Sequence, residues 1–565
     1  MNKRNIGNLP EPLSKVDYGV LDEEARTHIL EATRQTASLV ESTYGPVCLD
    51  TVVEDKASND KRDLIVTSRG SLVLDVIERN SGFSDPVAAV FVDALDSMER
   101  RLGDGTTTAA LLACALIRRG AELIDKGLHP VTVSIGYGIA NAYAGETLDA
   151  LSRPVDPSDR SRLADIARTA LNSISNPAVR DQYAEVIAEV IANLAATDEP
   201  GVNLDNVKIV SAANAADPLV RGVVVQRGPS PADESEWVRS NFEWELEFPK
   251  AETNLTVAIM DDAIEFEELS TTLSQSGRDN FVASSRAEMA QYQTALEAHQ
   301  DSELDRLGSL DIDVLVAQPR LNTEVRNGLR RRGIAVIDKV QYPLSDVYLL
   351  ADAMDATVVS DLADLDASVL GTATHVREQR FTDEKWTIFE GKTANAYTIV
   401  IVAGTAGRRA RLNNQLDAAL EITAVAAIDQ QILPSAGGHA LAVAHDLKQT
   451  YAPTIPEREQ LAVDAFADAL TDIVNTLVSN AGEDPLMILP SLREAYERRG
   501  YTPGYDVLTH KIVDPYEVGL VEPRRLFSHA IETAYGITEL LLLTDAFLYP
   551  TVPNDGLPIP LTERD

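Results

Sequence analysis

Apolar residues recur at helical spacing through the first 211 residues of the chain. Residues 22–42 show the pattern, because Ile29, Ala37 and Val40 fall along one side of a helix with polar residues between them. A loop that contains Gly45 and Pro46 ends this helix. The predicted elements, in chain order, are a helix over 22–42, a strand over 63–68, helices over 85–101 and 106–123, and mostly helix over 138–211.

The middle of the chain has short apolar runs that are typical of strands. Between the second and third of them lies a polar segment, about 262–306, with scattered apolar side chains. It is too apolar for a free linker and too sparse for a core helix, so we expect an exposed helical excursion. After about 364 the chain returns to a helix-rich region that ends near 548. The predicted strands cover 220–226, 255–260, 312–318, 333–338, 375–381 and 397–404.

Composition places the chain among globular proteins. Its 565 residues are 44% apolar and 24% charged, which excludes overall disorder and suggests three or four domains. No apolar run approaches the ~18 residues that a membrane span needs, and the N-terminus lacks the apolar core of a secretory signal. Cys48 and Cys114 are the only cysteines, so a disulfide framework is excluded, a cytoplasmic protein is expected, and both thiols are predicted to be small packing residues.

Charge is the unusual bulk property. Asp and Glu total 88 against 50 Lys and Arg, which gives a net charge of −38, and only 12 of the basic residues are Lys. Such a surface is soluble and repels nucleic acid and anionic lipid. We expect a halophilic protein, since high salt screens this self-repulsion; an ordinary acidic protein is the alternative.

A glycine- and threonine-rich run, Gly103-Asp104-Gly105-Thr106-Thr107-Thr108, precedes the helix predicted to follow it. The N–H groups and dipole of a helix N-terminus attract phosphate, threonine hydroxyls add donors, and one aspartate suits Mg²⁺. Asp and Thr are also common helix caps, and taken alone the pattern favours that ordinary role. The eight histidines form no metal motif such as HExxH and are expected mostly at the surface or in caps.

The segment GDGTTTAALLACALIRRGAELIDKGLHP (103–130) strongly resembles the group II chaperonins, the thermosome family. The resemblance extends over most of the chain, and the other segments that carry it are STYGPVCLD (42–50), DPLVRGVVVQ (217–226), EREQLAVDAFADAL (457–470), NAGEDPLMILPSLREAY (480–496) and VDPYEVGLVEPRRLFSHAIETA (513–534).

This resemblance implies a multidomain α/β chaperonin fold: a mainly helical equatorial domain, a small intermediate hinge domain and an α/β apical domain with a helical protrusion. Both chain ends build the equatorial domain. The implied boundaries are equatorial 1–137, intermediate 138–211, apical 212–363 with its protrusion at about 262–306, intermediate 364–397, equatorial 398–550 and a loose tail over 551–565.

Two aspartates of the family pattern are replaced. The family has Asn-Asp-Gly-Ala-Thr after its early strand, and Arg69 stands here where that aspartate activates water. Ala410 occupies the position of a second family aspartate, after Ala403-Gly404-Thr405. Orienting or general-base carboxylates contribute about 10²–10⁴-fold each, so hydrolysis is expected to be weak or lost. Arg69 could instead pair with a phosphate or block the site.

The resemblance also implies nucleotide-binding residues. Asp104 would hold Mg²⁺, and two of the three glycines of the family's Pro-Gly-Gly-Gly-Ala turn are replaced in Pro434-Ser435-Ala436-Gly437-Gly438. The acidic residue that faces the ribose is matched to Glu517. The full implied set is Gly45, Pro46, Asp104, Gly105, Thr106, Thr107, Thr108, Gly437 and Glu517.

The expected function is that of a cytoplasmic, ring-forming chaperonin subunit that binds ATP, Mg²⁺ and unfolded polypeptides. Its ring partners would be copies of itself, paralogous subunits or both, and it would bind neither nucleic acid nor membrane. Two alternatives stay open: a fully active, ATP-driven folding chaperonin, and a structural or adaptor subunit that works without nucleotide.

Overall fold

The chain is a mixed α/β protein that divides into two compact units. The first comprises 1–202 and 410–565, and the second comprises 203–409. No helix among the described residues is both long and apolar enough to cross a membrane. The computed structural model describes residues 16–47, 51–55, 63–67, 70, 72–74, 76, 85–196, 201–212, 217–227, 246–248, 250–262, 286–338, 340, 345–380, 385–391, 396–499 and 502–550.

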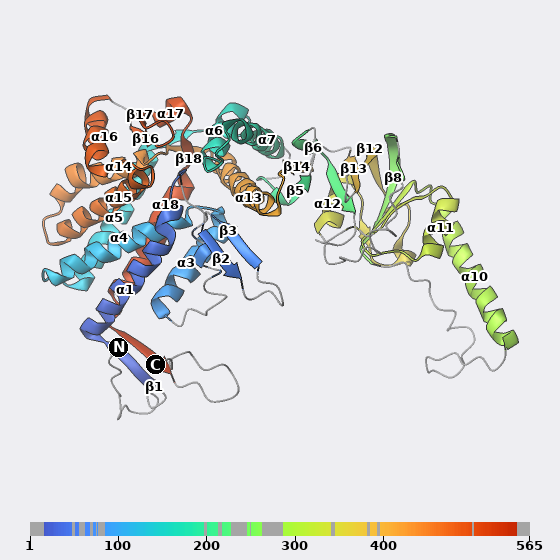
Figure 1. The fold of residues 1–565 in the computed structure, drawn as a ribbon, viewed down its shortest axis with the longest axis horizontal. Coiled ribbons are helices and arrows are strands. Elements are labelled where there is room, and N and C mark those ends of the chain that lie inside the picture. Colours follow the sequence, from blue (N-terminus) through green and yellow to red (C-terminus); the bar gives the residue numbers. More distant parts are fainter. Residues whose placement is uncertain are drawn as a thin grey trace. The chain divides into compact units, whose positions relative to one another are not determined.

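Helices dominate the first unit (Figure 1). Its central helix is α4, which packs against α1, α15 and α18 and buries apolar residues on all sides. Ala113, Cys114 and Gly120 keep α4 slim enough for these neighbours to approach. The helices are α1 (Asp22–Val40), α3 (Pro86–Leu102), α4 (Thr106–Asp125), α5 (Pro130–Leu151), α6 (Arg160–Ala170), α7 (Pro177–Ala195), α13 (Ala406–Asp429, which begins in the second unit), α14 (Gly438–Asp446), α15 (Glu459–Asn480), α16 (Pro485–Arg499), α17 (Pro515–Val518) and α18 (Arg524–Leu542).

Short sheets join distant segments of the first unit. β15 (Gln431–Pro434) lies between β4 (Arg153–Pro154) and β18 (Val521–Pro523), so residues near 434 and 522 become neighbours. β1 (Val16–Leu21) pairs with β19 (Ala546–Pro550), β2 (Thr51–Asp55) with β3 (Asp63–Thr67), and β16 (Gly504–Asp506) with β17 (Lys511–Val513).

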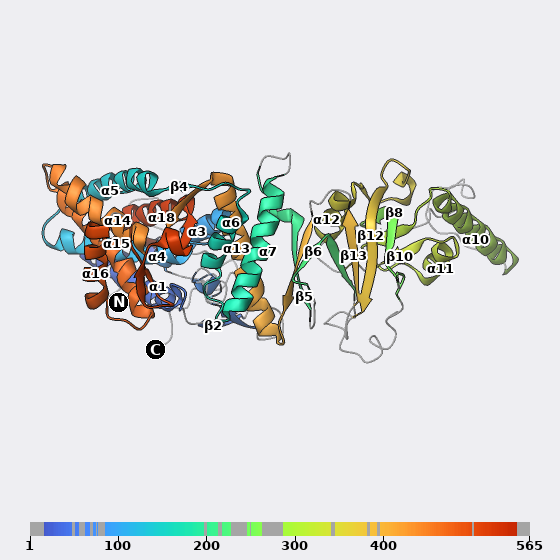
Figure 2. The same cartoon turned by 90° about the horizontal axis from the view of Figure 1, so that it is seen from above.

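The second unit is a sheet with helices on both faces, which is clearest in Figure 2. Alternation along the central strand β8 explains the layers: Val257 and Ile259 pack toward α12, while Ala258 and Met260 pack toward α10 and α11.

The strand order is β10-β9-β8-β12-β13-β7, with β11 beside β8, and β5-β14-β6 form a second sheet. The elements are β5 (Val207–Ala212), β6 (Leu219–Arg221), β7 (Val223–Arg227), β8 (Glu252–Met260), α10 (Arg286–Gly308), β9 (Val314–Ala317), α11 (Thr323–Arg331), β10 (Ala335–Ile337), α12 (Ser345–Met354), β11 (Val358–Val359), β12 (Gly371–Arg380), β13 (Lys385–Gly391) and β14 (Tyr397–Val402).

The predicted helices and strands occur close to their expected positions. In the polar excursion, 286–308 form helix α10, while 263–285 and the tail 551–565 lie outside the described residues. The domain boundaries expected at 137/138 and 397/398 fall inside α5 and β14, so both elements continue across them. Cys114 is buried, and burial raises the pKa of its thiol to about 12, as fits a packing residue; Cys48 lies outside the described residues.

Candidate functional site

Two glycines shape the turn between α3 and α4. Gly103 has a φ of 72° and Gly105 a φ of 86°, in the left-handed region that favours glycine. A Cβ on Gly103 would lie 1.6 Å from the carboxylate of Glu421, and one on Gly105 would lie 2.6 Å from Met98. The turn therefore excludes a side chain at positions 103 and 105. The N-cap of α4, Gly105, provides no side-chain acceptor for the first N–H groups. Such N–H groups bind anions well.

A cavity of about 280 Å³ lies at this helix start. Its volume is near the lower end of the ~300–1,000 Å³ that is usual for ligand pockets. Most lining residues come from the loop after α1, the first turn of α4, the end of α6, α13, the β15–α14 turn, β16 and the β18–α18 junction. Every lining residue belongs to the first unit.

Most of the sequence-predicted site residues line this cavity. They are Gly45, Pro46, Asp104, Gly105, Thr106, Thr107, Thr108 and Gly437. Glu517 does not line it, because Glu517 is exposed on α17. Glu522, five residues later in the same motif, is in the cavity wall instead. Sequence reasoning missed Glu522, although it directly precedes Pro523, the N-cap of α18.

Of the two residues that replace family aspartates, only Ala410 is among the described residues. Arg69 lies outside the described residues. Ala410 is exposed near the start of α13 and is not among the cavity residues, whereas the next residue, Arg411, lines the cavity. Asn414 and Gln415 follow one turn later on the same helix face, and Gln415 donates to the hydroxyl of Ser173 at 2.7 Å. The α13 wall is therefore cationic and amide-bearing, with no carboxylate among its cavity residues.

A second helix also begins at the cavity with a glycine N-cap. Gly437 has a φ of 76° and provides no side-chain cap for α14. The preceding residue, Ala436, has a φ of 56°, a conformation that strains a residue with a Cβ. The hydroxyl of Ser435 donates to Glu522 at 2.7 Å. His439 in the first turn of α14 is buried, as an exception to the expectation that the histidines lie mostly at the surface or in caps.

Two phenols complete the wall. Burial is the main cause that raises the pKa of Tyr44, the Glu522 carboxylate adds to it, and a hydrogen bond with Thr108 opposes it. Burial also raises the pKa of Tyr505, whose hydroxyl has no hydrogen-bond partner among the described residues. Both phenols therefore stay neutral near pH 7, and the buried Tyr505 hydroxyl is an unsatisfied polar group beside the cavity.

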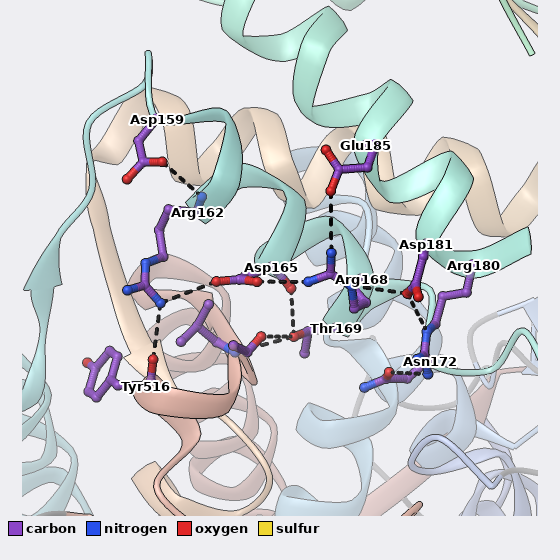
Figure 3. A network of polar contacts seen from close by, with 12 residues as sticks. Asp159, Arg162, Asp165, Arg168, Thr169, Asn172, Arg180, Asp181, Glu185 and Tyr516 are labelled. Carbon is purple, nitrogen blue, oxygen red and sulfur yellow. Dashed lines mark hydrogen bonds and ion pairs between the residues drawn. The ribbon is translucent and has the colours of Figure 1, made fainter. Parts of the chain in front are cut away.

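An ion-pair network joins α6 to α7 and to the loop around α17 (Figure 3). Asp165 accepts from Arg162 at 3.3 Å and from Arg168 at 2.8 Å. Arg168 also donates to Asp181 on α7 at 3.1 Å, and Arg162 donates to the carbonyl oxygen of Tyr516 at 3.1 Å. The two arginines thus link three segments through one carboxylate.

The network continues into the cavity wall through Thr169. Its hydroxyl lies 3.1 Å from the carbonyl oxygen of Gly519 and accepts from the N–H of Val521 at 3.3 Å. Thr169 itself lines the cavity. Displacement of the α6–α7 pair would therefore displace part of the cavity wall.

These residues fit a polyphosphate with one Mg²⁺. Two glycine-capped helix starts and three threonine hydroxyls supply donors, and Asp104 supplies a carboxylate. No group of three or more His, Cys, Asp or Glu able to hold a metal occurs among the described residues. Mg²⁺ needs no such group, because it is commonly held by one or two carboxylates and by substrate phosphates.

Known proteins resemble the chain along most of its length. The TCP-1/cpn60 chaperonin family matches residues 36–549. A thermosome subunit of Methanopyrus kandleri is 29% identical over 550 residues, which cover 96% of this chain and 94% of that protein. The thermosome subunit beta of Aeropyrum pernix is 29% identical over 93% of this chain and 91% of its own length. The thermosome subunit alpha of Archaeoglobus fulgidus is 28% identical over 92% and 91%.

Proposed function

The chain belongs to the TCP-1/cpn60 chaperonin family, and from this membership we propose that it is a cytoplasmic chaperonin subunit that binds ATP and assists the folding of unfolded polypeptides. Its ring would contain copies of itself or paralogous subunits. The observation that carries the nucleotide part of the proposal is the cavity at the paired starts of α4 and α14.

Each wall of the cavity has a role in this proposal. Thr106–Thr108 and the N–H groups of the α4 start bind phosphate oxygens, and Asp104 holds Mg²⁺, which neutralises phosphate charge when bound. Gly45 and Gly437 let the backbone approach the ligand closely. The ribose-facing carboxylate is assigned to Glu522, because Glu517 does not line the cavity.

Slow hydrolysis is the finer part of the proposal. The part of α13 that lines the cavity presents Arg411, Asn414 and Gln415 and no carboxylate. Loss of an orienting carboxylate commonly costs about 10²–10⁴-fold in rate. The Arg411 guanidinium in this wall favours binding of phosphate over activation of water. The subunit would therefore bind ATP and release it mostly uncleaved.

ATP binding tests the proposal first. Titration of the purified protein with a fluorescent ATP analogue should show saturable, Mg²⁺-dependent binding that Asp104→Ala weakens at least about tenfold. Asp93→Ala is the matched control, because Asp93 is exposed on α3 and does not line the cavity. Absence of binding in the wild-type protein would favour the nucleotide-independent adaptor.

Turnover separates the remaining alternatives. Wild-type protein should hydrolyse ATP slowly, and the variant Arg69→Asp, which restores the family carboxylate at that position, should hydrolyse it faster by an order of magnitude or more. Rapid wild-type turnover would instead identify a fully active, ATP-driven chaperonin and contradict the slow-hydrolysis proposal.

A further inference from the structure

His439 makes polar contacts with both of its ring nitrogens inside the cavity wall. Only 6% of the residue is exposed. Nδ1 lies 2.9 Å from the carbonyl oxygen of Pro434, and Nε2 lies 3.4 Å from Oε1 of Glu522. The ring stands nearly perpendicular to that of Phe527, with 3.8 Å between ring centroids. The imidazole is therefore held on three sides.

These contacts restrict where the protons lie. A carbonyl oxygen only accepts, so Nδ1 must carry the hydrogen that it donates to Pro434. In a neutral ring Nε2 would then have no hydrogen, and its lone pair would face a carboxylate oxygen of Glu522. The contact is attractive only when a proton lies between Nε2 and Oε1. An imidazolium–carboxylate pair would satisfy both contacts of the ring at once.

The other carboxylate oxygen is held as well. The hydroxyl of Ser435 donates to Oε2 of Glu522 at 2.7 Å. Both oxygens are therefore contacted by residues of one short segment, 435–439, while 18% of the Glu522 side chain remains exposed. This exposed part belongs to a residue that lines the cavity.

We propose that His439 and Ser435 are positioning residues for Glu522, and that the single proton shared by His439 and Glu522 couples nucleotide binding to pH. The inference rests on the proposed function, since it takes the ligand of the cavity to be an anionic nucleotide. With the proton, the pair has no net charge; without it, the pair carries −1 into the cavity. A polyphosphate therefore binds the protonated pair more tightly, and binding takes up protons.

The other titratable and charged groups of the cavity are carboxylates, a guanidinium and phenols. Asp104 and Asp506 contribute carboxylates and Arg411 contributes a guanidinium. Tyr44 and Tyr505 stay neutral, because burial raises the pKa of each. His439 is the only imidazole among the lining residues.

The charged groups of the first turn of α18, which packs against His439 through Phe527, are paired elsewhere. Arg524 forms an ion pair with Asp149, and Arg525 forms one with Asp429. Each of these two guanidinium groups is therefore balanced by a carboxylate outside the His439–Glu522 pair.

The test is calorimetric titration of the full-length protein with Mg²⁺ and a non-hydrolysable ATP analogue between about pH 6 and pH 9. Repeating each titration in buffers with different ionisation enthalpies measures the protons taken up. For the wild type we expect net uptake and an affinity that falls on the order of tenfold as the pH rises, the size that one added unit charge in a partly buried site produces.

Variants distinguish a role of His439 in the pH dependence of nucleotide binding from a purely structural role in the cavity wall. His439→Gln should bind the analogue with a flat pH profile and no proton uptake. Ser435→Ala, which keeps the imidazole, should weaken binding but retain the pH dependence. His529→Gln is the matched control, because His529 pairs with Glu532 at 3.1 Å on α18 and does not line the cavity; its profile should be that of the wild type.

The outcomes distinguish this inference from the proposed function. Binding without pH dependence or proton uptake in the wild type, or an unchanged pH profile in His439→Gln, would overturn the inference and leave nucleotide binding intact. Absence of binding by the wild type at every pH would overturn the proposed nucleotide function, and the inference with it.

Discussion

Ala436 is the residue whose backbone conformation conflicts most directly with its side chain in the candidate site. Its φ of 56° costs an L-residue about 1–2 kcal/mol relative to the right-handed region. Glycine adopts this conformation without the steric cost, although it makes the unfolded chain more flexible. The strain therefore outweighs the entropy that glycine would add.

We predict that Ala436→Gly raises the free energy of unfolding by about 0.5–1 kcal/mol. Ala142→Gly is the control, because Ala142 is exposed within α5 and glycine there should lower stability by about 1 kcal/mol. Denaturant unfolding of the three proteins measures both changes. A loss of stability in Ala436→Gly would show that the left-handed conformation is not strained.

Single residues also mark where sequence reasoning stopped. The pattern at 103–108 predicted a helix start with open N–H groups, and that is local information. The choice between Glu517 and Glu522 depends on the pairing of β15 with β18, which joins residues about 90 positions apart. The burial of His439 follows from the same pairing and from Phe527 on α18, so no local pattern could have indicated it.

At the scale of elements, the contact between α6 and the loop after α17 depends on Gly519. Its φ is 77°, and a Cβ there would lie 2.6 Å from Oδ1 of Asp165. Gly482 has a similar φ of 80° but nothing within 4 Å of the same position. Both glycines therefore need a left-handed backbone conformation, but only a Cβ on Gly519 would collide with Asp165.

We predict that Gly519→Ala lowers the free energy of unfolding by more than Gly482→Ala does. The backbone cost should be about 1 kcal/mol in each, and displacement of Asp165 from its two arginines should add roughly another 1 kcal/mol in Gly519→Ala. The difference between the denaturation midpoints of Gly519→Ala and Gly482→Ala measures the cost of displacing Asp165. Equal losses of unfolding free energy in the two variants would mean that Asp165 can move away from its arginines without destabilising the protein.

Elements with strong periodicity were predictable and long-range pairings were not. The sequence patterns predicted α1, α3 and α4 within about two residues, because capping and spacing are local. Asp85 followed by Pro86 shows why, since Asp85 caps α3 by accepting from the N–H of Val87 at 2.9 Å. The pairing of β1 with β19 was not predicted. It joins residues more than 500 positions apart, so no hairpin turn in the sequence connects the two strands and signals that they pair.

At the scale of the whole molecule, net charge is the property that should dominate the response to salt. A charge of −38 makes the compact state repel itself. Salt shortens the screening length from about 8 Å at 0.15 M to about 3 Å at 1 M. It also weakens exposed ion pairs such as Arg34–Glu31, but surface pairs of this kind contribute little to stability. Relief of the repulsion should therefore exceed the loss of pairs.

We accordingly predict that the thermal midpoint rises by several degrees as KCl increases from about 0.15 M to 1 M, and much less with each further addition, because screening saturates. Preferential exclusion of solutes stabilises proteins too, but it grows steadily with concentration. Sucrose at matched osmolality is therefore the control. A linear rise in KCl equal to that in sucrose would show that charge repulsion does not limit stability, and would remove the physical basis for expecting a salt-adapted protein.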